Sequence, residues 1–443
     1  MNRRMKLAIV GSGISGLAVA HAMKHQADIT VFEAGDYFGG HTHTVDVTLP
    51  TPQGMVTHGV DTGFLVFNER TYPNLIKLFT ELDVETAPSD MSFSVKVPGA
   101  LRGRTLEWSG TDLNSVFAQR SNLVNPKFWR MLLDVLRFNA LCTRIANEQR
   151  ETELQQPLAD FLRSHNFSDP FRDWYFLPML GCIWSCPTDQ MLQFPVATMI
   201  RFCHNHGLIQ VTDRPQWFSV VGGARNYVEK ILAGVHDKRL NTPVRLIERD
   251  AMGVRIVTDG HAERFDQVVI ATHTDQALRL LREPSAEERR LLGAIRYQDN
   301  HAVLHTDARV LPSHSKTWAA WNYERAANSE RESARVCLHY LLNRLQRIPF
   351  QQPVVVSLNP VQAIDPATIV GEYAYAHPVF DLAAIEAQKR LPLIQGQQRT
   401  WFAGAWTGYG FHEDGLKSGL NVGRALQQLI HDQAQPVQEK WAA

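Results

Sequence analysis

Three closely spaced glycines near the start of the chain could hold the diphosphate of a dinucleotide. Gly11, Gly13 and Gly16 follow a short apolar run at 6–10 and precede a helix-forming run at 17–25. In this arrangement the first glycine allows a tight turn and the second lets the diphosphate approach the backbone. The third lets the helix pack closely on the sheet. Unpaired N–H groups at the helix N-terminus would then face the diphosphate.

An acidic residue stands where such a site needs one. Glu33 lies twenty residues beyond Gly13 and directly follows the strand expected at 28–32. A carboxylate there accepts hydrogen bonds from the adenosine ribose and repels a 2′-phosphate, which disfavours NADP. A glycine triplet alone is often only a turn, but here a strand, a helix, a second strand and an acidic residue agree.

A second glycine pair, Gly39-Gly40, follows shortly after Glu33. The segment 33–41 (EAGDYFGGH) resembles the E-A-x-x-x-x-G-G-R motif of the flavin amine oxidase and phytoene desaturase superfamily. The resemblance implies one non-covalently bound FAD and a Rossmann-type α/β cofactor domain. The family's usual arginine, which helps to neutralise the diphosphate, is His41 in this chain.

The resemblance is most specific near the C-terminus. A strand at 401–404 is followed by the Glu413-Asp414-Gly415 segment and a helix expected from Leu416, with Asp414 as its N-cap. The family implies that this helix points at the flavin N1 and C2 carbonyl, where reduction places negative charge. The implied cofactor-binding residues are Gly11, Gly13, Ile14, Ser15, Gly16, Glu33, Ala34, Gly40, His41, Thr42, Gly63, Val244, Thr272, Gly404, Glu413, Asp414 and Gly415.

The expected chemistry is hydride transfer from an organic substrate. No second glycine-rich loop opens a helix after a strand, so we expect no dedicated NAD(P)H site. The flavin would pass its electrons to oxygen, a quinone or another carrier, while the protein positions the substrate and excludes water.

The family's amine oxidases usually carry a lysine near the flavin N5, which by position falls at 300–305, and that segment has none. The aromatic pair that sandwiches amines is incomplete, with Phe411 for one member and an uncertain partner among Tyr373 and Tyr375. Candidate catalytic groups are His301, Asn300 and His412, although a strand histidine is more often bonded to a backbone carbonyl.

A segment of the expected helical region has the pattern of a membrane-surface helix. The run 126–141 predicts an amphipathic helix, and Lys127, Arg130 and Arg137 lie among its apolar residues. Peripheral membrane contact is one interpretation, and an ordinary core helix is the other. The apolar face contains Phe128, Trp129, Leu132, Leu133, Leu136 and Phe138.

Three hypotheses for function follow. The segments 182–186 (CIWSC) and 192–195 (LQFP) resemble a bacterial subgroup of the superfamily that is associated with cyclopropane-fatty-acid-synthase-like enzymes. That resemblance favours an FAD-dependent dehydrogenase or desaturase of a fatty-acyl or other lipid chain. The alternatives are an amine oxidase and a flavin-bearing binding protein without turnover.

The family architecture implies two discontinuous domains. The FAD domain would comprise 1–70, 215–290 and 395–432, and an α+β substrate domain would comprise 71–214 and 291–394. Pro126, Pro157, Pro178 and Pro195 punctuate a largely helical stretch of the substrate domain. Residues 433–443 are expected to form a frayed tail.

Composition narrows the setting. Lys plus Arg and Asp plus Glu both number 45 among 443 residues, and no basic run predicts nucleic-acid binding. Five scattered cysteines favour a reducing cytoplasm, and the segment 126–141 would place the protein at the inner face of the membrane. Cys182 and Cys186 lack a second ligand pair, so no metal site is expected. No run of 18 uncharged apolar residues predicts a spanning helix.

Overall fold

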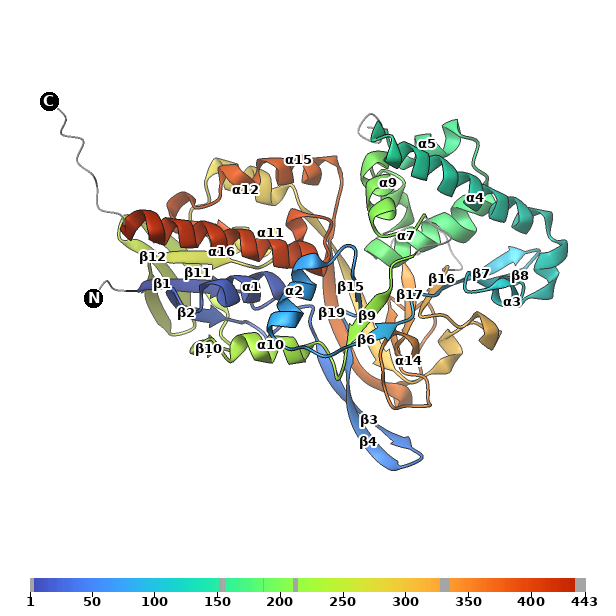
Figure 1. Ribbon diagram of the computed structural model, residues 1–443, viewed down its shortest axis with the longest axis horizontal. Helices are drawn as coiled ribbons and strands as arrows, with labels where there is room; N and C mark the ends of the chain where they lie inside the picture. The colour runs from blue at the N-terminus through green and yellow to red at the C-terminus, as the bar shows by residue number, and fades with distance from the viewer. Residues whose placement is uncertain are drawn as a thin grey trace.

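The computed structural model describes residues 4–150, 154, 156–185, 187–209, 214–326 and 335–434. One half of the molecule is built on a five-stranded parallel sheet with the strand order β10-β2-β1-β14-β20. These strands come from the start, the middle and the end of the chain (Figure 1). Their bounds are Met5–Val10 for β1, Ala27–Phe32 for β2, Asp237–Arg239 for β10, Gln267–Ile270 for β14 and Thr400–Phe402 for β20.

Strand β1 shows why this sheet is covered on both faces. Leu7 and Ile9 pack with four helices on one side, whereas Ala8 and Val10 pack with a second layer on the other. A parallel strand between two layers needs an unbroken apolar run, which β1 has. The first layer contains α1 (Ile14–Met23), α2 (Pro73–Glu81), α10 (Arg225–Leu232) and α16 (His412–Ala434). The second contains β11 (Val244–Asp250), β12 (Gly253–Thr258), β13 (His261–Phe265), α11 (Thr274–Leu280), α12 (Ala286–Gly293) and α15 (Leu382–Arg390).

Helices α1 and α16 approach closely through a stripe of glycines on α16. A Cβ at Gly415 would stand 2.8 Å from Ile14 Cγ2, and one at Gly423 would stand 2.7 Å from the Cβ of Ala22. Between them, a Cβ at Gly419 would overlap the carbonyl oxygen of Ser15. The absence of side chains at these positions therefore allows α16 to pack closely against α1, the helix that follows the first glycine loop.

The other half is built on a seven-stranded sheet with the order β19-β15-β18-β17-β16-β7-β8. Strands β16 and β7 pair in parallel, and the other neighbours pair antiparallel. The bounds are Phe93–Leu101 for β7, Arg104–Ser109 for β8, Arg296–His305 for β15, Trp321–Glu324 for β16, Cys337–Leu341 for β17, Val355–Leu358 for β18 and Ile369–Val379 for β19.

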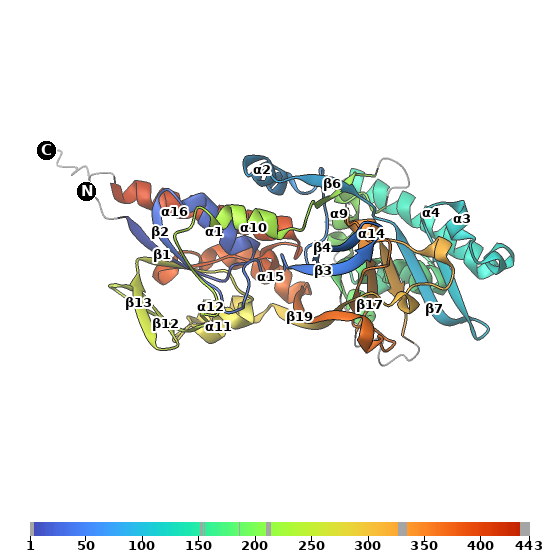
Figure 2. The ribbon, with the colours of Figure 1, turned by 90° about the horizontal axis from the view of Figure 1, so that it is seen from below.

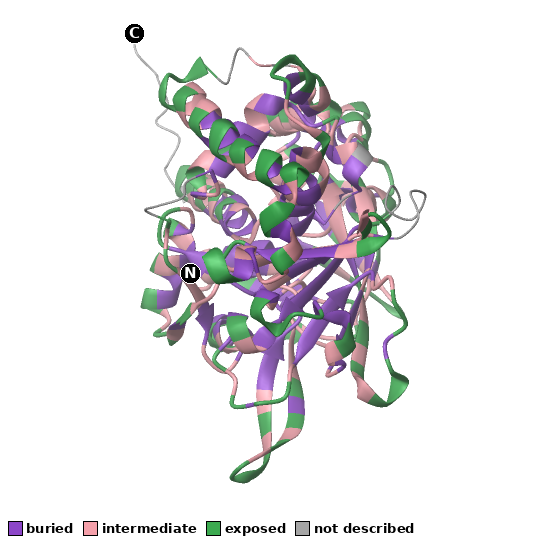
Figure 3. Ribbon diagram, turned by 90° about the vertical axis from the view of Figure 1, so that its right-hand side faces the viewer, coloured by how far each residue is buried: buried purple, intermediate pink, exposed green. Residues whose placement is uncertain are grey.

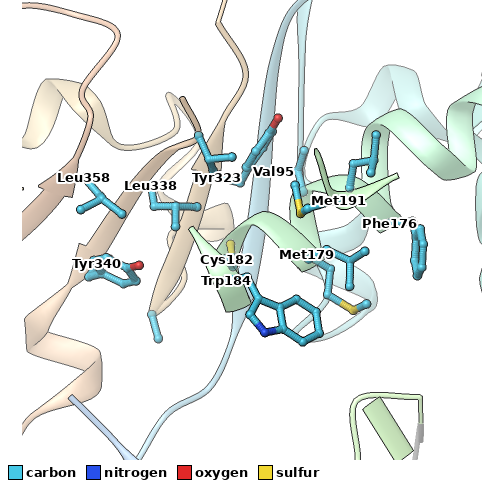
Figure 4. Close-up of a cluster of buried hydrophobic side chains, with 14 of the residues drawn as sticks. Val95, Phe176, Met179, Cys182, Trp184, Met191, Tyr323, Leu338, Tyr340 and Leu358 are labelled. Carbon is cyan, nitrogen blue, oxygen red and sulfur yellow. The ribbon is translucent and has the colours of Figure 1, made fainter. Parts of the chain in front are cut away.

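Helices cover one face of this sheet. Leu338 and Leu358 of the strands belong to the same buried apolar cluster as Met179 and Cys182 of α7 (Leu177–Trp184) (Figure 4). The neighbouring helices of this layer complete a large apolar core. The helices in this half are α3 (Leu113–Val116), α4 (Pro126–Asn147), α5 (Leu158–Ser164), α6 (Asp169–Phe171), α8 (Thr188–Met191), α9 (Val196–Asn205) and α14 (Leu342–Leu345).

Short strands join the two halves. β9 (Trp217–Val220) pairs with β5 (Phe67–Asn68) and β6 (Thr86–Ser89) in a small sheet at the junction. A hairpin of β3 (Thr44–Thr51) and β4 (Gly54–Asp61) projects away from the body of the molecule in Figure 1 and points toward the viewer in Figure 2.

The expected α/β class with its added α+β half is confirmed. The strands of the parallel sheet lie within 1–70, 215–290 and 395–432, and those of the seven-stranded sheet lie within 71–214 and 291–394. The C-terminal helix was expected from Leu416 but begins at His412, so Asp414 is not its N-cap. Of the expected tail, 435–443 lies outside the described residues, as does Cys186. Within the described ranges, no helix has the length and apolarity to cross a bilayer.

Candidate active site

A cavity of about 720 Å³ lies between the two halves and receives side chains from both. Strands β1 and β2 end at it, so the residues that follow these strands form one of its ends. Twelve residues expected to bind the cofactor line it: Gly11, Gly13, Ile14, Ser15, Glu33, Ala34, Gly40, His41, Gly63, Val244, Thr272 and Gly404.

The first glycine loop has the shape of a cradle. Gly13 is the N-cap of α1, and a Cβ built on it would meet no atom within 4 Å. Gly16 is different, because a Cβ there would overlap the carbonyl oxygen of Gly11. Gly13 therefore leaves space for a ligand, whereas Gly16 packs α1 against the sheet and does not line the cavity.

The Glu33 carboxylate is held by backbone donors. The N–H of Ser12 donates to Oε2 at 3.0 Å, and the N–H of Gly35 donates to Oε1 at 2.9 Å. These bonds fix the carboxylate at the cavity wall. Its remaining lone pairs suit the ribose hydroxyls of an adenosine.

We expect Glu33→Ala to weaken FAD binding to the apoprotein by about 1.5–3 kcal/mol, the scale of hydrogen bonds to a charged group. Titration calorimetry measures the difference directly. Glu33→Gln is the matched variant, because it keeps the side-chain length and one acceptor oxygen, and it should lose less. An affinity for Glu33→Ala equal to that of the parent would show that Glu33 does not hold the ribose.

His41 has a buried ring nitrogen without a hydrogen-bond partner among the described residues. Its Nε2 has no hydrogen-bond partner in the structure, although the residue lines the cavity. Burial lowers the pKa of His41 well below its usual range, and nearby His377 and His273 lower it further. The position therefore offers a neutral ring in place of the family's arginine. Together, the open cradle at Gly13, the held carboxylate and this orphaned nitrogen fit a dinucleotide.

The C-terminal block is arranged differently from the expectation. Glu413 accepts hydrogen bonds from the N–H of Asn74 at 2.9 Å and of Leu75 at 3.0 Å. It therefore caps the first turn of α2 and does not line the cavity. Asp414 accepts from the N–H of Tyr409 and of Phe411, both at 3.0 Å, and so closes the loop before α16. Gly415 contacts α1 instead of the cavity.

Thr42, also expected at the cofactor, lies one layer back. Its hydroxyl bonds the Tyr227 hydroxyl, which in turn bonds Nε2 of His412 at 2.8 Å. The His412 ring stacks on Phe64 with 3.8 Å between centroids and lines the cavity. Burial lowers the pKa of His412 to about 3, so this expected catalytic candidate is a neutral, rigidly held ring.

The other two catalytic candidates do not line the cavity. His301 points to the opposite side of β15, where its Nε2 lies 2.8 Å from Glu372 Oε2 and its side chain is 45% exposed. Its proposed place beside the flavin is therefore not supported. Asn300 is buried and does not reach the cavity itself. Its Nδ2 lies 2.9 Å from Nδ1 of His377, and His377 does line the cavity.

A backbone N–H group fixes the orientation of the side-chain amides that bond His377. The N–H of His301 donates to Oδ1 of Asn359, so Nδ2 of Asn359 donates to Oδ1 of Asn300. Nδ2 of Asn300 must then donate to Nδ1 of His377. Burial lowers the pKa of His377 to about 4, so the neutral ring carries its proton on Nε2. Asn300 is thus a positioning residue.

His206 has the opposite tautomer and was not singled out from the sequence. Its Nδ1 lies 2.9 Å from the carbonyl oxygen of Phe202, which can only accept, so Nδ1 carries the proton. Burial lowers the pKa of His206 to about 4, so the ring that lines the cavity is neutral and its Nε2 is unprotonated. Its place at the C-cap of α9 gave no signal in the sequence.

The rest of the cavity wall is largely apolar. Trp184 and Tyr340 face it from α7 and β17, and Met179 and Cys182 lie beside them (Figure 4). Among the described residues that line the cavity, the charged side chains are Glu33 and Arg279, and none is a lysine. Further wall residues are Met91, Phe93, Ile183, Phe202, Leu208, Trp321, Val356, Leu358 and Phe411.

A group with metal-ligand spacing lies elsewhere in the described chain. Ligand atoms of Glu324, Cys337 and His339 all fall within 4.8 Å of one another, and all three residues are buried. Lys96 Nζ lies 3.0 Å from Glu324 Oε1, and Nδ1 of His339 bonds Ser357. Since the carboxylate is already neutralised, the group is complete as a hydrogen-bonded network without an ion.

Comparisons with known proteins agree with this site. The family model described as flavin containing amine oxidoreductase matches residues 14–341. The fold resembles that of cyclohexylamine oxidase from Brevibacterium oxydans IH-35A, with 17% identity over 97% of this chain and 100% of the other and a TM-score of 0.66. It also resembles a fatty acid isomerase from P. acnes (15% identity, 97% and 99% coverage, TM-score 0.65) and a putrescine oxidase (15%, 96% and 99%, TM-score 0.63).

No curated protein matches the chain at a significant level. At this level of identity, the solved structures show only that the fold is shared. The family match spans well over half of the chain, and the family it describes contains flavin. The protein therefore belongs to the flavin-containing amine oxidoreductase family and is an FAD-dependent oxidoreductase.

Proposed function

We propose that the protein oxidises an apolar substrate, a fatty-acyl or related lipid chain. The observation that carries the proposal is the charge distribution of the cavity. Its charged lining side chains, Glu33 and Arg279, belong to the nucleotide end, beside Gly13 and Val244. The other described residues of the wall offer apolar surface to a hydrocarbon and no carboxylate to an ammonium group. The fatty acid isomerase among the similar folds and the resemblance to a lipid-associated bacterial subgroup point the same way.

Bound FAD supplies the two-electron chemistry of this reaction. A saturated chain would lose a hydride to the cofactor and a proton from the adjacent carbon, leaving a carbon–carbon double bond. His206 lines the cavity with its Nε2 unprotonated, so this nitrogen is the candidate to accept that proton. His377 also lines the cavity, with its proton on Nε2, and would donate a hydrogen bond there, while the apolar wall would exclude water. Oxygen, a quinone or another carrier would take the two electrons.

Amine oxidation is the second candidate, because Phe411 and Tyr375 both line the cavity and could flank an amine. A flavin-bearing protein without turnover is the third. We also propose a cytoplasmic location, since Cys142, Cys182, Cys203 and Cys337 are buried free thiols, as suits a reducing compartment.

Anaerobic reduction of the flavin distinguishes the three candidates. We expect palmitoyl-phosphatidylglycerol or palmitoyl-coenzyme A to bleach the flavin absorbance of the holoprotein, and putrescine and cyclohexylamine to leave it unchanged. Mass spectrometry of the reduced mixture should then find a chain lighter by two hydrogens. Bleaching by the amines alone would favour the second candidate. No bleaching by any donor at full FAD occupancy would favour the third.

A variant that narrows the cavity tests the site itself. Val356→Trp places a large ring in the apolar wall and should slow reduction by the acyl substrate about tenfold or more, because misplacement of the substrate is costly. FAD content should stay at the level of the parent. Val370→Trp is the matched control, since Val370 is 42% exposed on β19 and should tolerate the ring without loss. Unchanged reduction by Val356→Trp would place the substrate elsewhere.

A further inference from the structure

Exposed apolar side chains gather on one part of the molecule. Eleven large hydrophobic residues of the described chain are exposed, and six of them fall between 113 and 136. Three precede α4 and three lie on it. They are Leu113 (77%), Leu123 (44%), Val124 (84%), Trp129 (44%), Leu133 (61%) and Leu136 (57%). We call this set the apolar face.

Helix α4 has two apolar sides. Phe128, Met131 and Phe138 are fully buried in the core beneath it. Trp129, Leu133 and Leu136 recur at helical spacing on the outer side. The expected wide apolar face is therefore divided, and Phe128 and Phe138 belong to the core. The outer side turns away from the molecule at the end opposite to β1 (Figures 1 and 3).

The charge beside the apolar face is strongly positive. From 113 to 147 the chain has five basic residues and a single acidic one, Asp134. Asp134 is buried and lies 3.2 Å from Nε of Arg130 and 3.4 Å from Nη1 of Arg137, so it adds no exposed negative charge. The basic residues are Arg120, Lys127, Arg130, Arg137 and Arg144.

Acidic residues on the adjacent described helices are mostly offset by arginines. Asp160 lies 3.0 Å from Arg163, and Arg172 lies 2.9 Å from Asp169 and 2.7 Å from Asp173. One negative charge remains there, against the larger positive charge of α4 and the segment before it.

We infer that the apolar face docks on a membrane surface rich in anionic lipid. Its aliphatic side chains supply burial among acyl chains, and the basic residues attract the headgroups. Trp129 suits the boundary between the two, because its ring is partly apolar and its Nε1 already donates to Leu123 O at 2.8 Å. A protein partner would need acidic groups matched to these positions, whereas an anionic bilayer presents negative charge everywhere. The inference stands whatever the substrate is.

Flotation of the holoprotein with vesicles tests this. We expect binding to vesicles of phosphatidylglycerol and phosphatidylethanolamine, weaker binding to pure phosphatidylcholine, and release as salt rises. The double variant Leu133→Asp/Leu136→Asp should lose about tenfold or more of the bound fraction. Lys127→Glu/Arg144→Glu should lose about tenfold at low salt, since each exposed basic residue contributes to attraction. Arg130 and Arg137 are left intact, because both anchor on Asp134.

Two controls keep the result interpretable. Met252→Asp/Leu382→Asp changes residues that are 81% and 54% exposed at other sites and should bind as the parent does. FAD content shows that every variant is folded. Absence of flotation at low salt, or equal flotation of parent and apolar-face variants, would overturn the inference. Loss of a dimer in Leu133→Asp/Leu136→Asp, measured by sedimentation without vesicle binding, would assign the face to a second copy of the chain.

Discussion

Gly13→Val should give a folded, colourless protein. The valine Cβ enters space that the protein itself leaves open, so packing around it is not disturbed. The backbone at Gly13 (φ −63°, ψ 172°) is extended and acceptable to valine. The same space is where the FAD diphosphate must approach the N-terminus of α1. We expect the visible flavin spectrum to disappear and the circular dichroism of the apoprotein to remain.

Two further glycine variants serve as comparisons for Gly13→Val. Gly110→Val is the matched control, because a Cβ there meets only Trp108 at 3.8 Å and lies far from the cradle along the chain. It should retain stoichiometric FAD. Gly16→Val should instead fail to fold, since its Cβ would overlap the carbonyl oxygen of Gly11. A Gly13→Val protein that keeps its FAD would contradict the assignment of the loop.

The apoprotein should lose stability steeply as pH falls below about 6.5. Burial lowers the pKa of His206, His305 and His377 to about 4 and that of His412 to about 3. Each histidine binds a proton more readily in the unfolded chain, so folding is favoured above the unfolded pKa and disfavoured as pH drops toward the folded value. Each contributes a slope of about 1.4 kcal/mol per pH unit in that window.

Two carboxyl groups act in the opposite direction. Burial raises the pKa of Asp61 and Asp414 to about 6, so their protonation favours the folded chain as pH falls from 6 to 3.8. His41, whose pKa burial also lowers, adds a fifth histidine, and Glu413, whose pKa burial raises, adds a third carboxyl. The histidines still outnumber the carboxyls by two, which leaves a net loss of roughly 2–3 kcal/mol per pH unit. Urea unfolding between pH 7 and 4.5 measures it.

A single histidine can be removed from this balance. His305→Asn keeps an acceptor for the N–H of Asp307 and cannot take up a proton, so it should flatten the pH dependence by about one histidine's share. His261→Asn makes the same exchange at an exposed position on β13 and is the matched control. A flat stability profile for the parent between pH 7 and 5 would show that these rings are not held neutral by burial.

The cofactor half could be predicted because its signals are local. Gly11, Gly13 and Gly16 lie in one turn, and Glu33 follows at a distance set by one helix and one strand. Each of these requirements is imposed by backbone geometry within forty residues. The strands and the acidic residue therefore appear where the sequence places them, and the helix, expected over 17–25, runs from Ile14 to Met23.

The substrate side could not be predicted as well, because it depends on strand faces and distant partners. Successive side chains of β15 point to opposite faces, so His301 turns outward although Asn300 reaches a cavity residue. Both faces of the strand centre are buried, which hides the alternation in sequence. The Glu413 carboxylate accepts hydrogen bonds from the first turn of α2, 339 residues earlier, and no local sequence pattern indicates that contact.

The glycine stripe of α16 has a consequence for biosynthesis. The loop at Gly13 is made long before the helix that braces α1. Strand β20, which completes the parallel sheet beside β14, is equally late. Cofactor loading should therefore wait until both elements have been made, and nascent chains that lack 400–430 should remain colourless. Until then the apolar side of α1 is uncovered, so the newly made chain depends on rapid closure of its two ends.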